Sequence, residues 1–215
     1  FQVKDLSAFG MKDNIHAQGA CAALLSYLKY TQKGEISHIR KMEKLGTSGY
    51  LALDRSTIYN LELFNTLREG GRKGTLLDFI DETKTPMGAR LLKQWLSKPL
   101  YDVSSIIARQ KAIETQIVET GLRESLLAHL TQLLDIERIL SRLAVSIGNP
   151  RDAVNLSQSL ELAVVIKKLL LTNKDPHLND IASRINEKLA DLSVYIRNRI
   201  ENAPPFDPKS GGFVK

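Results

Sequence analysis

A short glycine-rich run, Gly-Gly-Arg-Lys-Gly-Thr at residues 70–75, is the segment closest in composition to a phosphate-binding loop. It offers backbone N–H groups, a lysine and a hydroxyl before an apolar helix. A Walker A loop needs Gly, four residues and then Gly-Lys-Ser/Thr, so that the lysine follows the second glycine and reaches the terminal phosphates. Here Lys73 precedes Gly74. The order predicts an ordinary loop, and we expect the chain neither to bind nor to hydrolyse ATP.

The histidines, the cysteine and the acidic residues predict no active site. Asp135 and Glu137 could suggest paired catalytic carboxylates, but Arg138 and Arg142 follow one turn apart, and ion pairs on or between helices explain all four. Cys21 lies in an apolar helix stripe, where a buried thiol is inert. The four histidines are far apart and include no His-x-x-x-His or Glu-x-x-His pair: His16, His38, His129 and His177. We therefore assign no catalytic, cofactor-binding or metal-binding residue.

An aromatic group near residue 95 leaves two interpretations open. Trp95 and Tyr101 lie close to two lysines and could stack nucleic-acid bases. Trp95 also shares a helix face with Leu91 and Leu92, which favours burial in the core. Core packing is the preferred interpretation.

Composition narrows the class of protein. Of 215 residues, 43% are hydrophobic and 25% are charged, which excludes a disordered or low-complexity chain. The formal net charge of +6 is mild beside dedicated nucleic-acid-binding domains. A single cysteine cannot form an internal disulfide, so a reducing compartment is expected. No run approaches the ~20 apolar residues of a transmembrane helix, and we expect a cytoplasmic protein without a membrane partner.

Helical periodicity dominates the chain and predicts a mainly α fold. A short amphipathic helix is predicted at residues 17–32, and a tight corner at residues 147–152 precedes a later helix. After Gly121, the leucines of residues 126–143 predict one helix with a single apolar face. Other helix starts are marked by side chains that can accept from free N–H groups: Asp54 or Ser56, Thr75, Thr85 before Pro86, Asp102, and Asp175 before Pro176.

Two further elements complete the predicted fold. The apolar stripe after Pro176 continues to Asn202, which predicts one long helix of about 27 residues and ~40 Å. Charges balance on its other faces, as is typical of solvated helix surfaces. Near residues 38–53, short apolar segments around a glycine-bounded turn predict a small β-hairpin.

Three segments resemble the core domain of MutS, a family of DNA mismatch recognition ATPases. They are YLALDRSTIYNLEL from Tyr50, TPMGARLLKQWLSKPL from Thr85, and DIERILSRLA followed by NPRD from Asp135. Their order and separation also match the family. Upstream, FGMKD and AQGACAALLSYLKYTQKGEISHIR resemble the passage from the connector domain into the core, and NAPPFDPKSGGFVK near the C-terminus resembles the strand-forming start of the clamp domain.

The resemblance implies a division into three parts. Residues 1–14 would end a connector-to-core linker, residues 15–202 would form a helical core with a long lever helix, and residues 203–215 would lead toward a clamp domain. Such a piece is non-catalytic and transmits conformational change between the DNA-binding clamp and the ATPase domain. Because the chain has neither a Phe-x-Glu wedge nor a Walker A motif, the family's mismatch-reading and catalytic residues map to no position here.

The resemblance also implies properties of a longer parent protein. The first residue is Phe1 rather than Met, and we expect the chain to be part of that parent. The parent would be a DNA-dependent ATPase that uses ATP and Mg, binds mismatched double-stranded DNA through other domains, forms a homodimer and works with a MutL-type protein. One alternative stays open, a helical interaction scaffold of a MutS relative that acts in recombination rather than repair.

Overall fold

The computed structural model describes residues 14–32, 49–145, 147–205 and 211–215. The chain divides into two compact units, residues 1–48 and 49–215. In the first unit the structure describes α1 (Ile15–Gln32), whose first turn is capped by the Asn14 side chain. The predicted mainly α fold is confirmed, and within the described residues β-structure is limited to isolated bridges.

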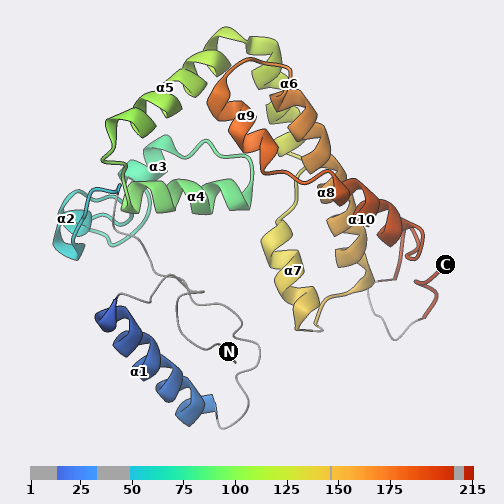
Figure 1. Ribbon diagram of the computed structural model, residues 1–215, viewed down its shortest axis with the longest axis horizontal. Helices are drawn as coiled ribbons and strands as arrows, with labels where there is room; N and C mark the ends of the chain where they lie inside the picture. The colour runs from blue at the N-terminus through green and yellow to red at the C-terminus, as the bar shows by residue number, and fades with distance from the viewer. Residues whose placement is uncertain (1–13, 33–48, 146, 206–210) are drawn as a thin grey trace. The chain divides into compact units, whose positions relative to one another are not determined.

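The second unit is built from short and medium helices joined by tight connections (Figure 1). In chain order its described helices are α2 (Arg55–Asn60), α3 (Leu76–Ile80), α4 (Pro86–Ser97), α5 (Val103–Val118), α6 (Thr120–Leu130), α7 (Ile136–Ala144), α8 (Pro150–Leu170), α9 (Pro176–Ser183) and α10 (Lys188–Arg197).

Side-chain caps start most of these helices where the sequence predicts them. At the corner of residues 147–152, Asn149 and Asp152 cap each other's backbone N–H groups at 3.0 and 3.1 Å. Asp54, rather than Ser56, caps α2. The cap acceptors and their distances to the backbone nitrogen three residues on are Asp54, 2.6 Å; Thr75, 3.1 Å; Thr85, 2.9 Å; Asp102, 2.8 Å; and Asp175, 2.9 Å.

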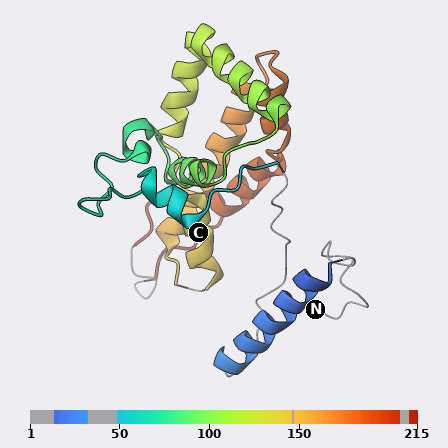
Figure 2. The same ribbon diagram turned by 90° about the vertical axis from the view of Figure 1, so that its left-hand side faces the viewer.

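Helix α8 is the spine of the second unit, and α6, α7, α9 and α10 all contact it (Figures 1 and 2). Its 21 residues make it the longest helix in the described part of the chain, about 31 Å at 1.5 Å per residue. Two buried clusters line it. Toward its start, Leu156 and Leu160 pack with Ile139 of α7 and with Leu189 and Ile196 of α10.

The second cluster lies along the C-terminal half of α8. Ile166 and Leu170 pack with Ala112 of α5 and with Leu178 and Ala182 of α9. Leucines from α6 and the turn after it cover this cluster from outside. A single continuous helix therefore contributes to both cores.

The predicted single helix from Pro176 to Asn202 is wrong, because the chain breaks between α9 and α10. The turn at residues 184–187 is made by two tight bonds, from the Arg184 N–H to the Ile181 carbonyl and from the Ile185 N–H to the Ala182 carbonyl. The Asn186 side chain then accepts from the Lys188 N–H at 3.0 Å and starts α10. Apolar spacing is kept across the turn because both short helices pack on α8.

The predicted single helix through residues 126–143 is also wrong. The chain leaves α6 after Leu130 and begins α7 at Asp135, whose side chain accepts from the Arg138 N–H at 3.2 Å. Between them, the Leu134 N–H donates to the Ser159 hydroxyl of α8 at 3.3 Å, so the turn is fastened to the spine. The break before this stretch falls at Glu119, and Gly121 lies inside α6.

The predicted β-hairpin near residues 38–53 falls mostly outside the described residues. In the part that the structure describes, Tyr50 forms an antiparallel bridge with Leu100. At the other end of the unit, Ile200 pairs with Val214. None of the helices in the described ranges is long and apolar enough to cross a bilayer.

Candidate functional site

The glycine-rich loop uses its own donors and charges internally. The Gly74 N–H donates to the Asp78 carboxylate at 3.1 Å, and Arg72 pairs with Asp81 at 2.5 Å. Hydrogen bonds from Thr83 and then from Arg72 lower the pKa of Asp81. The Gly74 N–H and the Arg72 guanidinium are thus already bound to carboxylates. These contacts support the interpretation of residues 70–75 as an ordinary loop.

The predicted burial of Trp95 is wrong. The residue is 41% exposed, Leu91 beside it is 47% exposed, and α4 holds no buried residue. The indole ring instead stacks under the Arg109 guanidinium of α5, whose central carbon lies 3.6 Å from the ring centroid. Trp95 of α4 therefore packs against the cation of Arg109 rather than in a buried core.

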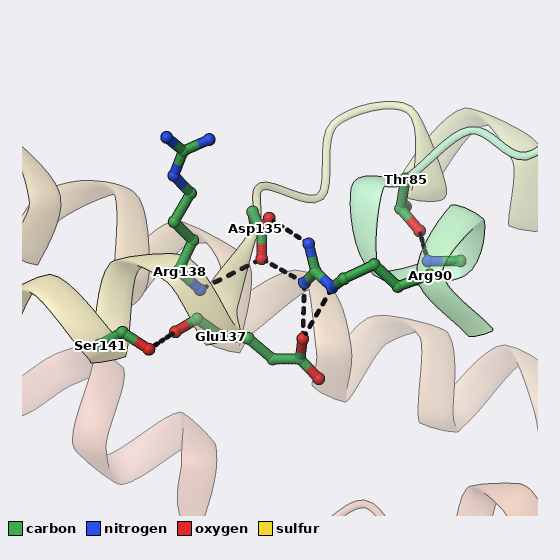
Figure 3. A network of polar contacts seen from close by, with 7 residues as sticks. Thr85, Arg90, Asp135, Glu137, Arg138 and Ser141 are labelled. Carbon is green, nitrogen blue, oxygen red and sulfur yellow. Dashed lines mark hydrogen bonds and ion pairs between the residues drawn. The ribbon is translucent and has the colours of Figure 1, made fainter. Parts of the chain in front are cut away.

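The strongest polar site of the described residues joins α4 to α7, and we name its three members, Arg90, Asp135 and Glu137, the Arg90 clasp (Figure 3). Both terminal nitrogens of Arg90 donate to the Asp135 carboxylate at 2.8 Å. Glu137 accepts from the same guanidinium at 2.6 and 3.1 Å. Such planar, two-pronged contacts fix direction as well as distance.

Local sequence signals place each member of the clasp. Thr85 and Pro86 start α4, so Arg90 lies at the end of its first full turn. Asp135 is the cap of α7, and Glu137 follows in the first turn of that helix. One carboxylate therefore both caps a helix and binds an arginine from another helix. Figure 3 shows the Arg138 guanidinium pointing away from the two carboxylates.

The contacts of the clasp shift the pKa of Asp135 and of Arg90. The hydrogen bonds from Arg90 lower the pKa of Asp135 from 3.8 to about 2, despite partial burial of the carboxyl group. Asp135 and Glu137 in turn raise the pKa of Arg90. Asp135 and Arg90 therefore stay charged across the physiological pH range.

A second ion pair fastens α7 to α8. Arg142 near the end of α7 binds both carboxylate oxygens of Asp152, with the Nε–Oδ2 contact at 3.2 Å. Asp152 also belongs to the α8 capping box, and its side chain is 6% exposed. Hydrogen bonding from Arg142 lowers its pKa. The ion pairs predicted on or between helices are confirmed for Asp135, Glu137 and Arg142, and each of them joins two helices.

A cavity of about 350 Å³ lies beside the clasp and is lined by Phe64, Arg72, Asp81, Arg90 and Lys93. Its cations are already engaged. Arg72 and Arg90 bind carboxylates, and the Lys93 ammonium lies 5.3 Å from the Phe64 ring centroid. Both arginines of the cavity are therefore already bound to carboxylates.

The remaining candidates are the four histidines and Cys21. His16 is exposed on α1, His177 is half-buried in the first turn of α9, and His129 lies on α6 with a buried Nδ1 that has no hydrogen-bond partner. His38 lies outside the described residues. Cys21 is half-buried rather than fully buried. Within the described ranges, no three His, Cys, Asp or Glu side chains gather as metal ligands would.

Sequence reasoning missed Arg90 as a site residue. The cap at Thr85 and Pro86 was a sufficient signal for the helix, but no local pattern connects Arg90 to carboxylates 45 and 47 residues away. Asp135 gave a usable signal, since an Asp before an apolar helical stretch is a typical cap.

Comparison with known proteins identifies the scaffold that carries this site. The family model of MutS domain III matches residues 56–215, which hold every described helix of the second unit after α2 and all but the first residue of α2 itself. The chain belongs to the MutS family. Domain III is distinct from the ATPase domain of these proteins.

Full-length relatives support the same assignment. The chain is 38% identical over all 215 residues to the DNA mismatch repair protein MutS of Symbiobacterium thermophilum, covering 24% of that protein. It is 36% identical over 200 residues, 93% of the chain, to the DNA mismatch repair protein MutS of Methanothrix thermoacetophila, covering 23% of that protein. The chain thus spans about a quarter of the length of the curated relatives that it matches.

Proposed function

We propose that this chain is the core or lever segment of a MutS-type DNA mismatch repair protein and transmits conformational change between a DNA-binding clamp and an ATPase domain. The segment itself is non-catalytic. The match to MutS domain III and the mismatch repair names of the full-length relatives support this proposal.

One structural observation supports the mechanical part of the proposal. Helix α8 is continuous and contributes residues to both buried clusters, so a displacement of one cluster moves the other through an unbroken rod. A continuous helix packed at both ends is stiff, whereas one with a break bends there. The lever role therefore belongs to α8 rather than to the interrupted stretch from Pro176 to Asn202.

The parent protein completes the proposed function. We propose that it is a DNA-dependent ATPase that uses ATP and Mg, binds mismatched double-stranded DNA through other domains, forms a homodimer and works with a MutL-type protein. Residues 1–14 would end its connector-to-core linker, residues 15–202 would form the core, and residues 203–215 would lead toward the clamp. These properties rest on family membership.

The test kinks α8 between the two clusters of the full-length parent. Val165 is 38% exposed and lies just before the Ile166–Leu170 part of the second cluster. Val165→Pro removes one backbone hydrogen bond, clashes with the preceding turn and costs about 3 kcal/mol or more. Val165→Ala is the matched control, because it shortens the side chain without altering the backbone. We expect the proline variant to keep basal ATPase activity and to lose the effect of ATP on DNA dissociation.

The measurement is the DNA dissociation rate with and without ATP. The alanine control should retain the parent's response. If folded Val165→Pro protein released DNA in response to ATP as the parent does, α8 would not be the lever. If the proline variant does not fold, Val165→Gly is a milder change. It should destabilise α8 by about 1 kcal/mol relative to the alanine control.

A further inference from the structure

Residues 49–102, which we name the arm, are the first segment of the second unit, and the two ends of this segment lie side by side. Its two ends are joined by the Leu51 N–H donating to the Pro99 carbonyl at 2.8 Å and the Tyr101 N–H donating to the Gly49 carbonyl at 2.9 Å. The bridge between Tyr50 and Leu100 lies between these bonds. The arm therefore has a fixed base.

The arm has its own small interior and takes no part in the two clusters around α8. Inside it, Leu63, Thr75 and Leu77 are buried at 1–6% exposure. The residues of both clusters come from α5 through α10 and the turn after α6. The two buried clusters around α8 therefore hold helices α5 to α10 together, and their members include no described residue of the arm.

Beyond the Asp102 cap contacts with Ser104 and Ser105, two side-chain contacts in the described residues connect the arm to residues 103–205 and 211–215. Near the base, Trp95 stacks on Arg109 of α5. Farther along α4, five residues earlier and about 7.5 Å away along the helix axis, Arg90 binds Asp135 and Glu137 of α7. The first contact lies close to the pivot, and the second lies farther from it.

We propose that the arm is a hinged element, that its pivot lies at Tyr101 and Asp102, and that the Arg90 clasp is the latch that holds it closed against α7. The inference concerns a motion within this chain and goes beyond the proposed function. Asp102 fixes the start of α5 through its cap contacts with Ser104 and Ser105, so rotation is confined to the short link before that helix.

The exposure of the clasp suits a latch rather than a permanent joint. The Arg90 side chain is 48% exposed and that of Glu137 is 70% exposed, so salt and solvent screen their attraction. Asp135 is only 15% exposed, which keeps the closed geometry specific. An interaction of this kind closes in one arrangement and opens at little cost.

The latch also connects the arm to the spine. Asp135 caps α7, α7 is bound to the start of α8 through Arg142 and Asp152, and α8 runs on to the second cluster. Opening of the clasp would therefore release the arm from the helix that leads into α8.

The experiment measures the separation of α4 and α7 by pulsed electron spin resonance on the complete chain. Spin labels are placed at Gln94→Cys and Leu140→Cys, two exposed positions outside the clasp, in a Cys21→Ala background. The unaltered clasp should give one narrow distance distribution. Arg90→Gln should broaden the distribution and lengthen its mean.

The matched control is Arg138→Gln, the same change in charge at an exposed arginine whose side chain points away from the clasp (Figure 3). It should leave the distribution narrow. The proposal is overturned if Arg90→Gln leaves the distribution unchanged, or if Arg138→Gln broadens it as much.

Two further measurements keep the proposal testable if Arg90→Gln does not fold. Glu137→Gln removes one carboxylate of the clasp without removing a helix cap and should broaden the distribution in part. On the labelled chain with an intact clasp, raising NaCl from about 0.05 M to about 1 M shortens the screening length from roughly 14 Å to roughly 3 Å and should also broaden it. A distribution that stays narrow in both measurements would show that the arm is not latched by charge.

Discussion

At the scale of single residues, two carboxylates each cap a helix and also bind an arginine from another helix. Asp135 caps α7 and binds Arg90, and Asp152 caps α8 and binds Arg142. A helix N-terminus already favours a negative charge, so a cap carboxylate is a fixed and oriented partner for an arginine from elsewhere. Each residue thereby fixes the start of one helix relative to another.

Replacing Trp95 should have a moderate effect on stability. Because the ring is 41% exposed and stacks on Arg109, Trp95→Ala should lower the free energy of unfolding by about 1–2 kcal/mol, rather than the ~3–5 kcal/mol of a fully buried ring. Trp95→Phe should retain part of the stacking, so its free energy of unfolding should lie between that of the parent and that of Trp95→Ala. Urea denaturation measures both variants, and a loss in the range of a buried ring would contradict the exposed stacking arrangement.

The charge of Asp135 should appear in the acid dependence of stability. Its pKa is lowered from 3.8 to about 2 by Arg90, so the folded state holds the ionised form more tightly than the unfolded state. This stabilisation is present above about pH 4 and is lost as the pH falls from 4 toward 2.

The substitution Asp135→Asn isolates that charge, because Asn is also a good helix cap. Between pH 2 and 4 the variant should take up fewer protons on unfolding than the parent does, by up to about one proton. The cap of α7 is kept. Asp102 titrates in the same window, with a pKa lowered to about 2 by Ser104 and Ser105. The difference between variant and parent in pH-dependent thermal unfolding is therefore the measurement, and parallel curves would contradict the prediction.

At the scale of elements, serines allow α8 and α10 to approach closely. Ser193 of α10 is fully buried, and its hydroxyl donates to the Ser157 carbonyl of α8 at 2.9 Å. Ser157 is itself fully buried. Small side chains at such a crossing leave no room for a larger group.

Enlarging Ser193 should therefore separate the two helices. Ser193→Leu should cost about 1–3 kcal/mol through overpacking, in addition to about 1 kcal/mol for the lost hydrogen bond. Ser193→Ala loses only the hydrogen bond and is the control. Equal chemical denaturation midpoints for the two variants would show that the crossing has spare volume.

Several helix starts could be predicted from the sequence, whereas the helix breaks near Asn186 and Thr131 could not. Thr85 with Pro86 and Asp175 with Pro176 marked α4 and α9 because a cap acts on N–H groups only two or three residues away. The breaks near Asn186 and Thr131 keep their apolar spacing, since the helices on both sides pack on α8. The apolar periodicity alone therefore predicts one helix where the tertiary structure has two.

The candidate site was predictable only in part for the same physical reason. Ion pairs were expected for Asp135 and Glu137, but their partner, Arg90, lies 45 to 47 residues upstream. Trp95 was expected in the core because its helix face is apolar, yet no buried cluster lies over that face. The local spacing of apolar residues shows which face of a helix is apolar. It does not show which part of the protein, if any, packs on that face.

At the scale of the whole molecule, the net charge of +6 comes from 30 basic and 24 acidic residues, and some of the described arginines are already paired with carboxylates. Many of the described arginines hold carboxylates rather than facing solvent as a free basic stripe. The described arginines that form ion pairs with carboxylates are Arg72, Arg90, Arg142, Arg184 and Arg197. A duplex would have to displace these ion pairs before it could use the same charges.

This distribution of charge predicts the behaviour of the chain toward DNA. Phosphate contacts supply most of the non-specific affinity for a duplex, and each contact contributes to the slope of log affinity against log salt. Discrimination of a mispair further requires groups that reach base edges or exploit local deformability. The chain has no Phe-x-Glu sequence, and the aromatic side chain of Trp95 is already stacked on Arg109.

We therefore expect the 215-residue chain to bind duplex DNA weakly, with a steep loss of affinity as salt rises, and to bind matched and mispaired duplexes equally. Fluorescence anisotropy with two labelled duplexes that differ at one base pair, titrated at several salt concentrations, measures both properties. Arg138→Gln and Arg90→Gln give an internal comparison, because the first removes a cation outside the clasp and the second removes one already bound to carboxylates. Arg138→Gln should weaken binding at least as much as Arg90→Gln. A clear preference for the mispaired duplex at about 0.15 M salt would show instead that this segment reads mismatches itself.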